Sequence, residues 1–89
     1  MPQPLHIVAA GNTLAPALAE LVSLGFFVSR VVVSAPGESF LRAEKSGIVL
    51  DASDPLELLG LAMLAERRGA EWAPSDIEVD AFLKLQGVV

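Results

Sequence analysis

Cysteine is absent from this chain of 89 residues, and histidine and tryptophan occur once each. Without cysteine the chain forms no disulfide and offers no thiolate ligand to a metal, and a single histidine cannot supply the common zinc sites. The sequence therefore predicts a protein that binds no metal and no cofactor.

Recognisable catalytic motifs are also missing. The only histidine, His6, lies in an apolar run, and no motif links it to a nucleophile. Ser39 follows Gly37 at the spacing of a nucleophile elbow, but Leu41 stands where that motif needs its second glycine. We therefore expect a protein that is not an enzyme.

Positive charge is scarce, because six Lys and Arg residues face eleven Asp and Glu residues, giving a net charge of −5. Nucleic-acid binding depends on neutralising phosphates with Lys and Arg, and anionic membrane surfaces attract basic segments. The composition thus excludes both as expected partners.

The apolar stretch 5–33 is interrupted by Glu20 and Arg30, which disfavours a membrane span, and the N-terminus has no cationic signal-peptide region. We expect a cytoplasmic protein.

Apolar residues make up 53% of the chain before its seven glycines are counted, whereas soluble domains average about 45–50% with glycine included. A chain of this length forms one domain, residues 1–89, and has a high ratio of surface to volume. It is therefore expected to cover part of its apolar surface by forming oligomers.

The alternation of apolar runs with turn residues predicts an α+β fold of two layers (a two-layer α/β arrangement), with elements in the order β-α-β-β-β-α-α. Strands are expected at residues 5–9, 26–33, 40–45 and 48–52, helices at residues 14–24, 55–68 and 76–86, and a turn at residues 34–38. The sheet is predicted to be four-stranded and mixed, with three strands in an antiparallel meander and the helices on one face. Strand 26–33 is apolar on both faces, which predicts an interior position.

Two local patterns make the prediction specific. A two-residue turn at Ser46-Gly47 pairs Lys45 with Ile48, which puts Arg42 opposite Asp51 on the charged face and predicts an ion pair between them. Helix starts are marked in three places. Asn12 or Thr13 precedes the first helix, Asp54-Pro55 with Glu57 opens the second, and Ser75 with Glu78 forms a capping box for the third.

The helix at 55–68 has no clean polar side before Glu66, and its Gly60 is unfavourable unless another helix approaches closely. Either the last helix of the same chain or a second copy of the chain is expected to cover it. The predicted interface comprises Leu61, Leu64, Arg67, Arg68, Glu71 and Trp72. Within this set, Trp72 is expected to lock the corner between the two helices, and an anchoring role at the interface is the alternative.

A turn between the first strand and the first helix offers a different kind of site. Gly11, Asn12 and Thr13 lie at a helix N-terminus, where backbone N–H groups can hold an anion. The glycine-rich fingerprint of dinucleotide-binding proteins and the Lys-containing phosphate loop are both absent. Binding of an anion or small ligand at this turn is therefore the alternative function.

The α-β-β-β-α order from 13 to 68 resembles, in layout, a double-stranded-RNA-binding domain. That resemblance implies RNA binding, but the second long helix here starts at Asp54-Pro55-Leu56-Glu57, where such domains place basic residues against phosphates. The acidic start argues against this function. The sequence therefore favours a small non-catalytic protein-interaction or regulatory module. We expect its partner to be a second copy of the chain, in a homodimer, or another protein.

Overall fold

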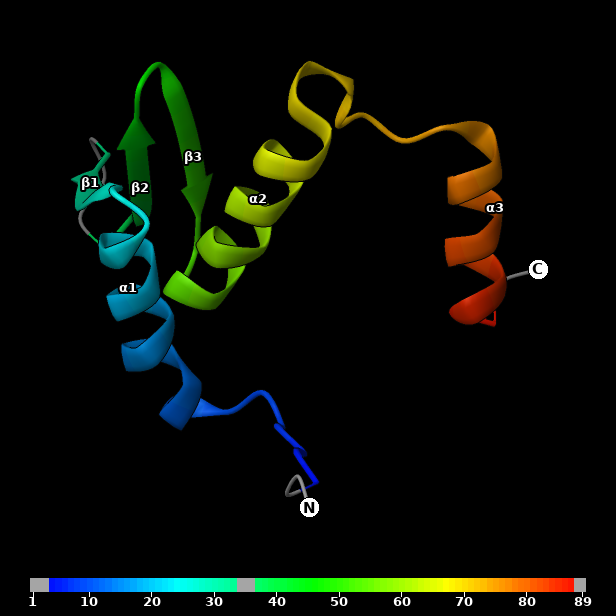
Figure 1. Ribbon diagram of the computed structural model, residues 1–89, viewed down its shortest axis with the longest axis horizontal. Helices are drawn as coiled ribbons and strands as arrows, with labels where there is room; N and C mark the ends of the chain where they lie inside the picture. The colour runs from blue at the N-terminus through cyan, green and yellow to red at the C-terminus, as the bar shows by residue number, and fades with distance from the viewer. Residues whose placement is uncertain (1–3, 34–36, 88–89) are drawn as a thin grey trace.

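The computed structural model describes residues 4–33 and 37–87 and has an α+β fold. Its elements, in chain order, are a 3-10 turn (Gly11–Thr13), helix α1 (Leu14–Ser23), strands β1 (Phe27–Val32), β2 (Ser39–Lys45) and β3 (Ile48–Ala52), helix α2 (Pro55–Arg68), a second 3-10 turn (Gly69–Glu71) and helix α3 (Asp76–Leu85). Figure 1 shows that α1 and α2 lie beside the sheet while α3 stands apart from it.

The first expected strand is not formed. Residues 4–10 have no regular secondary structure and are exposed throughout. Within the described residues the sheet has three strands in the order β1-β2-β3, with both pairs antiparallel, so the four-stranded mixed sheet and the leading strand of the predicted order are not observed. The apolar pattern of residues 5–9 fits a strand, but a strand also needs a neighbour to pair with its backbone, and the pattern does not supply one.

Strand β1 lies at an edge of the sheet, not in its interior as its sequence predicted. The reason is the missing fourth strand, because without it only β2 pairs with β1. Phe27 and Val32 of β1 are exposed. The turn expected at 34–38 lies mostly outside the described residues, although Gly37 has the positive φ of 86° that such a turn favours.

The hairpin of β2 and β3 has the predicted register, with Lys45 opposite Ile48 and Arg42 opposite Asp51. Ser46 and Gly47 both have positive φ, 48° and 84°, as the central residues of a two-residue hairpin turn require. The predicted ion pair is confirmed: Arg42 donates from Nε and Nη2 to the two carboxylate oxygens of Asp51 at 2.8 and 3.0 Å. These bonds hold the pKa of Asp51 below its usual range.

The core lies between one face of the sheet and the two helices α1 and α2, which also contact each other. Its buried members come from α1, β2 and α2, together with the residue before β1: Leu21, Phe26, Ala43, Leu58 and Ala62. Lys45 adds a tie between layers, because its Nζ donates to the carbonyl oxygen of Leu24 at the end of α1, at 2.6 Å. The predicted packing of helices on one face therefore describes α1 and α2.

The helix starts are largely as expected. The Asp54 carboxylate accepts the N–H of Glu57 at 2.8 Å, and Ser75 and Glu78 form the complete capping box of α3. At α1 the expected side-chain cap is not formed. There, a 3-10 turn precedes the helix, and the Thr13 hydroxyl donates to the carbonyl oxygen of Ala10 instead of capping it.

Helix α3 covers no part of the core. It is described along its full length, and none of its residues is buried. The extended residues 4–10 and the projecting α3 give a radius of gyration of 15.8 Å, against about 12 Å for a compact chain of this length. Of the two covers expected for α2, the one from the last helix of the same chain is not made.

Candidate functional site

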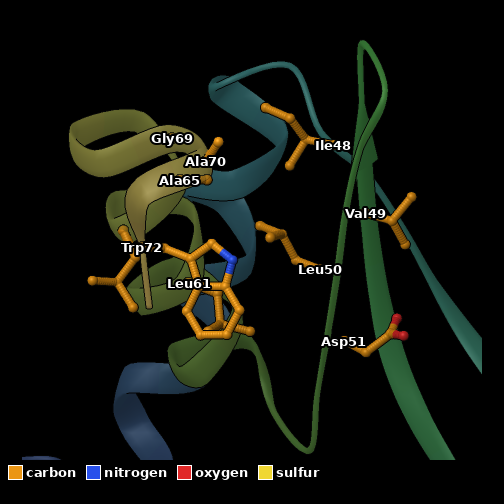
Figure 2. A pocket seen from close by; sticks show the side chains of 10 residues that line it. Ile48, Val49, Leu50, Asp51, Leu61, Ala65, Gly69, Ala70 and Trp72 are labelled. Atoms are coloured by element: carbon orange, nitrogen blue, oxygen red, sulfur yellow. The ribbon is translucent and has the colours of Figure 1, made fainter. Parts of the chain in front are cut away.

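An apolar groove with a volume of about 510 Å³ runs between strand β3 and helix α2, and we call it the β3–α2 groove. It is lined by ten residues from β3, α2 and the segment after α2: Ile48, Val49, Leu50, Asp51, Leu61, Leu64, Ala65, Gly69, Ala70 and Trp72. Figure 2 shows the side chains of these residues, of which Leu50 and Trp72 lie between the strand and the helix.

One wall of the groove is the outer edge of the sheet. Four consecutive residues of β3, from Ile48 to Asp51, line it. Side chains alternate along a strand, so consecutive lining residues indicate that the groove follows the strand edge. In Figure 2, Ile48 and Leu50 point toward α2, whereas Val49 and Asp51 point away from it. Among the described residues β3 pairs only with β2, so this edge presents unpaired backbone groups.

The opposite wall is one face of α2. Leu61, Leu64 and Arg68 are spaced i, i+3 and i+7 and therefore share this face. Leu64 is 39% exposed although it is a leucine in the middle of a helix. A second hollow shares Asp51, Leu61 and Leu64 with the groove and continues past Gly60. The apolar surface thus extends along α2.

Gly60 does not serve a helix contact within this chain. A Cβ atom built on Gly60 would meet nothing within 4 Å. The close approach that its sequence position suggested is not made by any described residue of the protomer.

Trp72 belongs to the groove and not to a corner between helices. It is 60% exposed and lines the groove with Leu61, as Figure 2 shows. The expected corner between α2 and α3 does not form, because α3 projects away from α2. Trp72 is therefore an accessible aromatic side chain in the lining of an apolar groove.

The charged residues predicted around Trp72 behave differently from one another. Arg68 binds Glu78 of α3, with its Nη2 3.0 Å from the carboxylate. This bond, followed by the backbone N–H of Ser75, holds the pKa of Glu78 below its usual range. Arg67 and Glu71 are exposed and do not line the groove. The structure thus brings Leu61, Leu64 and Trp72 together and places Arg68 at the end of the same helix face.

The turn at 11–13 is arranged as the start of a helix. Thr13 donates both its backbone N–H and its hydroxyl to the carbonyl oxygen of Ala10, at 3.0 and 2.6 Å. Gly11 and Asn12 are exposed, and residues 4–10 before them form no strand. Two of the donors that an anion would need are therefore already used, and anion binding here stays a prediction. His6 lies in the exposed stretch before this turn.

The strand wall of the groove is the part that sequence reasoning missed. The register of the hairpin contained the signal, because it puts Ile48 and Leu50 on the apolar face of the sheet. What it did not show is that β3 ends the sheet and that α2 leaves a gap beside it. Asp51, the one charged residue of the groove, is bonded to Arg42, so the groove offers apolar contact and backbone hydrogen bonds.

No family model, curated protein or solved structure matches this chain. The described residues contain no cluster of three or more side chains suited to hold a metal ion. In residues 4–33 and 37–87, no helix has the length and apolar character needed to cross a membrane. The β3–α2 groove is lined by three of the six residues expected at an interface, Leu61, Leu64 and Trp72.

Proposed function

We propose that this protein is a non-catalytic protein-interaction module that forms a homodimer through the β3–α2 groove. The observation that supports the proposal is an apolar groove along an unpaired sheet edge, with Leu64 and Trp72 accessible in it. Tryptophan is a frequent anchor at protein interfaces, and an unpaired strand edge invites a partner. Contact with a second protein would cover both.

Helix α2 supplies a second line of support. It is not enclosed by its own protomer, because Leu56 and Leu64 are both exposed. Burying apolar surface is favourable by about 25 cal/mol per Å². A homodimer covers such a helix without enlarging the chain, which fits the high apolar content of the sequence.

The proposal is tested by following association of the purified chain. Sedimentation velocity from about 1 to about 300 µM should show a dimer replacing a monomer. Over the same range the emission of Trp72, the only tryptophan, should shift to shorter wavelength as its exposed ring is covered. A chain that stays monomeric at the highest concentration, with unchanged emission, would overturn the proposal.

Neighbouring positions on α2 provide a matched pair of variants. Leu64→Asp puts a charge into the groove and should weaken the dimer at least about 30-fold. Met63→Asp adds the same charge one residue earlier, at a side chain that is 56% exposed and does not line the groove, and should leave association unchanged. Both variants should keep the circular dichroism spectrum of the folded chain. A dimer sensitive only to Met63→Asp would place the interface elsewhere.

A further inference from the structure

Helix α3 has an apolar face that no residue in the described parts of the chain covers. Glu78, Phe82 and Leu85 are spaced i, i+4 and i+7 and share one side of the helix. Phe82 is 58% exposed and Leu85 is 84% exposed. The acidic side chains Asp76 and Asp80 lie on a different side. A ten-residue helix with this pattern needs a partner surface, since burial of its apolar side is the main source of stability for so short a helix.

The ion pair between Arg68 and Glu78 lies at one end of this face. Arg68 closes the face of α2 that carries Leu61 and Leu64, and Glu78 opens the face of α3 that carries Phe82 and Leu85. Their bond at 3.0 Å therefore joins the two apolar faces at one end. Figure 1 shows α3 standing clear of α2 beyond that end. In Figure 1, α2 lies between β3 and α3.

The amount of exposed surface indicates what covers the groove and the apolar face of α3. The protomer has an accessible surface of 7100 Å², whereas a compact monomer of its mass has about 5000 Å². The surplus, to which residues 4–10 and α3 both contribute, exceeds the roughly 800 Å² per partner that a standard interface buries. A second copy carries the same surplus and the same complementary pair of surfaces, one a groove and the other a helix.

We propose that α3 of each copy lies in the β3–α2 groove of the other, with Phe82 and Leu85 packed against Leu61 and Leu64. The proposal rests on the proposed function, because it names the element that fills the groove of the homodimer. A two-fold axis makes the exchange reciprocal, so that both grooves and both helices are covered at once. Insertion of an amphipathic helix into an apolar groove is a common mode of recognition.

The polar side of α3 fits this position. Asp76, Asp80 and Lys84 follow one another at i, i+4 and i+8 along the helix, away from the face that carries Phe82 and Leu85. When the apolar face is buried in the groove of the second copy, these charges stay in water and lose no solvation. In its own chain, the bond of Glu78 to Arg68 is formed while α3 stands clear of α2.

Substitutions on the two sides of α3 test the proposal in the full chain. Phe82→Ala removes the side chain expected to fill the groove and should raise the dimer dissociation constant at least about 30-fold in sedimentation equilibrium. Lys84→Ala makes a comparable truncation on the polar side and should leave it unchanged. Because neither residue is buried in the protomer, both monomers should keep their fold by circular dichroism.

Disulfide trapping shows which chain supplies the helix. The protein has no cysteine, so Leu64→Cys and Phe82→Cys introduce the only thiols. When the two single variants are mixed, one of them with a mass tag, the main product should be a disulfide that joins position 64 of one chain to position 82 of the other, and not a 64–64 or 82–82 disulfide. If the double variant forms its disulfide only within one chain, α3 closes on its own groove and the proposal is wrong.

The outcomes separate this inference from the proposed function. If Leu64→Asp abolishes the dimer while Phe82→Ala leaves it intact, the groove is the interface but α3 does not fill it. If removal of residues 1–10 abolishes the dimer and Phe82→Ala does not, the N-terminal segment is the occupant. If the chain never associates, the proposed function itself fails.

Discussion

At the scale of single residues, Glu78 has the most consequential position. Its carboxylate accepts the N–H of Ser75, which completes the capping box of α3, and it also binds Arg68 of α2. One side chain therefore both starts α3 and sets the end at which α3 is attached. Loss of its charge should affect the helix and its direction together.

Acidification tests this dual role. Arg68 and the N–H of Ser75 lower the pKa of Glu78, so folded α3 with its bond to α2 favours the ionised carboxylate. The stabilisation is present above the ordinary glutamate pKa of about 4.3 and is lost as the pH falls through the lower folded value. An NMR titration of the α3 amides should show this loss. Glu78→Gln should lower the stability of α3 already at pH 7 and remove most of the pH dependence of its amide shifts. If the variant and the original protein titrate alike, the dual role of Glu78 is wrong.

The two ion pairs show which residue contacts a sequence can predict. Arg42 and Asp51 face each other because strand alternation and a two-residue turn fix their register, and this pair was predicted. Arg68 and Glu78 lie on two helices joined by a loop, so local rules account for each of them separately, one near a helix C-terminus and one in a capping box. Their contact depends on the angle between the helices, which no local rule provides.

At the scale of elements, local signals predicted most boundaries. The caps at Asp54 and Ser75 and the hairpin turn are set by residues within a few positions of one another. The segment 5–9 shows the limit of this reasoning, because its apolar residues predict a strand but leave its partner undefined. The same residues could form a strand that pairs with this sheet or with the sheet edge of another molecule. In the protomer they form no strand.

Gly60 allows a test of whether any segment of the protomer packs against this side of α2. An added Cβ atom would meet nothing within 4 Å, so alanine fits without strain. Alanine is favoured over glycine inside a helix by about 1 kcal/mol. Gly60→Ala should therefore raise the free energy of unfolding of the dilute monomer by about this amount in urea titrations. A lower stability would mean that another segment packs against Gly60, contrary to the structure.

At the scale of the whole molecule, the sequence predicted surplus apolar surface without placing it. The 53% apolar content is a total, and it applies equally to a chain that hides its surplus and to one that displays it. The sequence nevertheless points to the groove residues Leu61, Leu64 and Trp72, because α2 has no clean polar side before Glu66 and Trp72 lies shortly after this helix. The strand wall of the groove and the apolar face of α3 depend on how the elements are arranged, which the total does not contain.

The net charge of the molecule provides the last prediction. Each copy carries −5, so two copies repel each other as they approach, and the contact surfaces proposed here are apolar. Salt screens the repulsion, because the Debye length falls from about 10 Å at 0.1 M to about 3 Å at 1 M. Apolar contacts are not weakened by this screening. The dimer dissociation constant should therefore fall roughly threefold or more between low and high sodium chloride in sedimentation equilibrium. A dissociation constant that rises with salt would mean that ion pairs between the copies, and not the groove and α3, hold the dimer together.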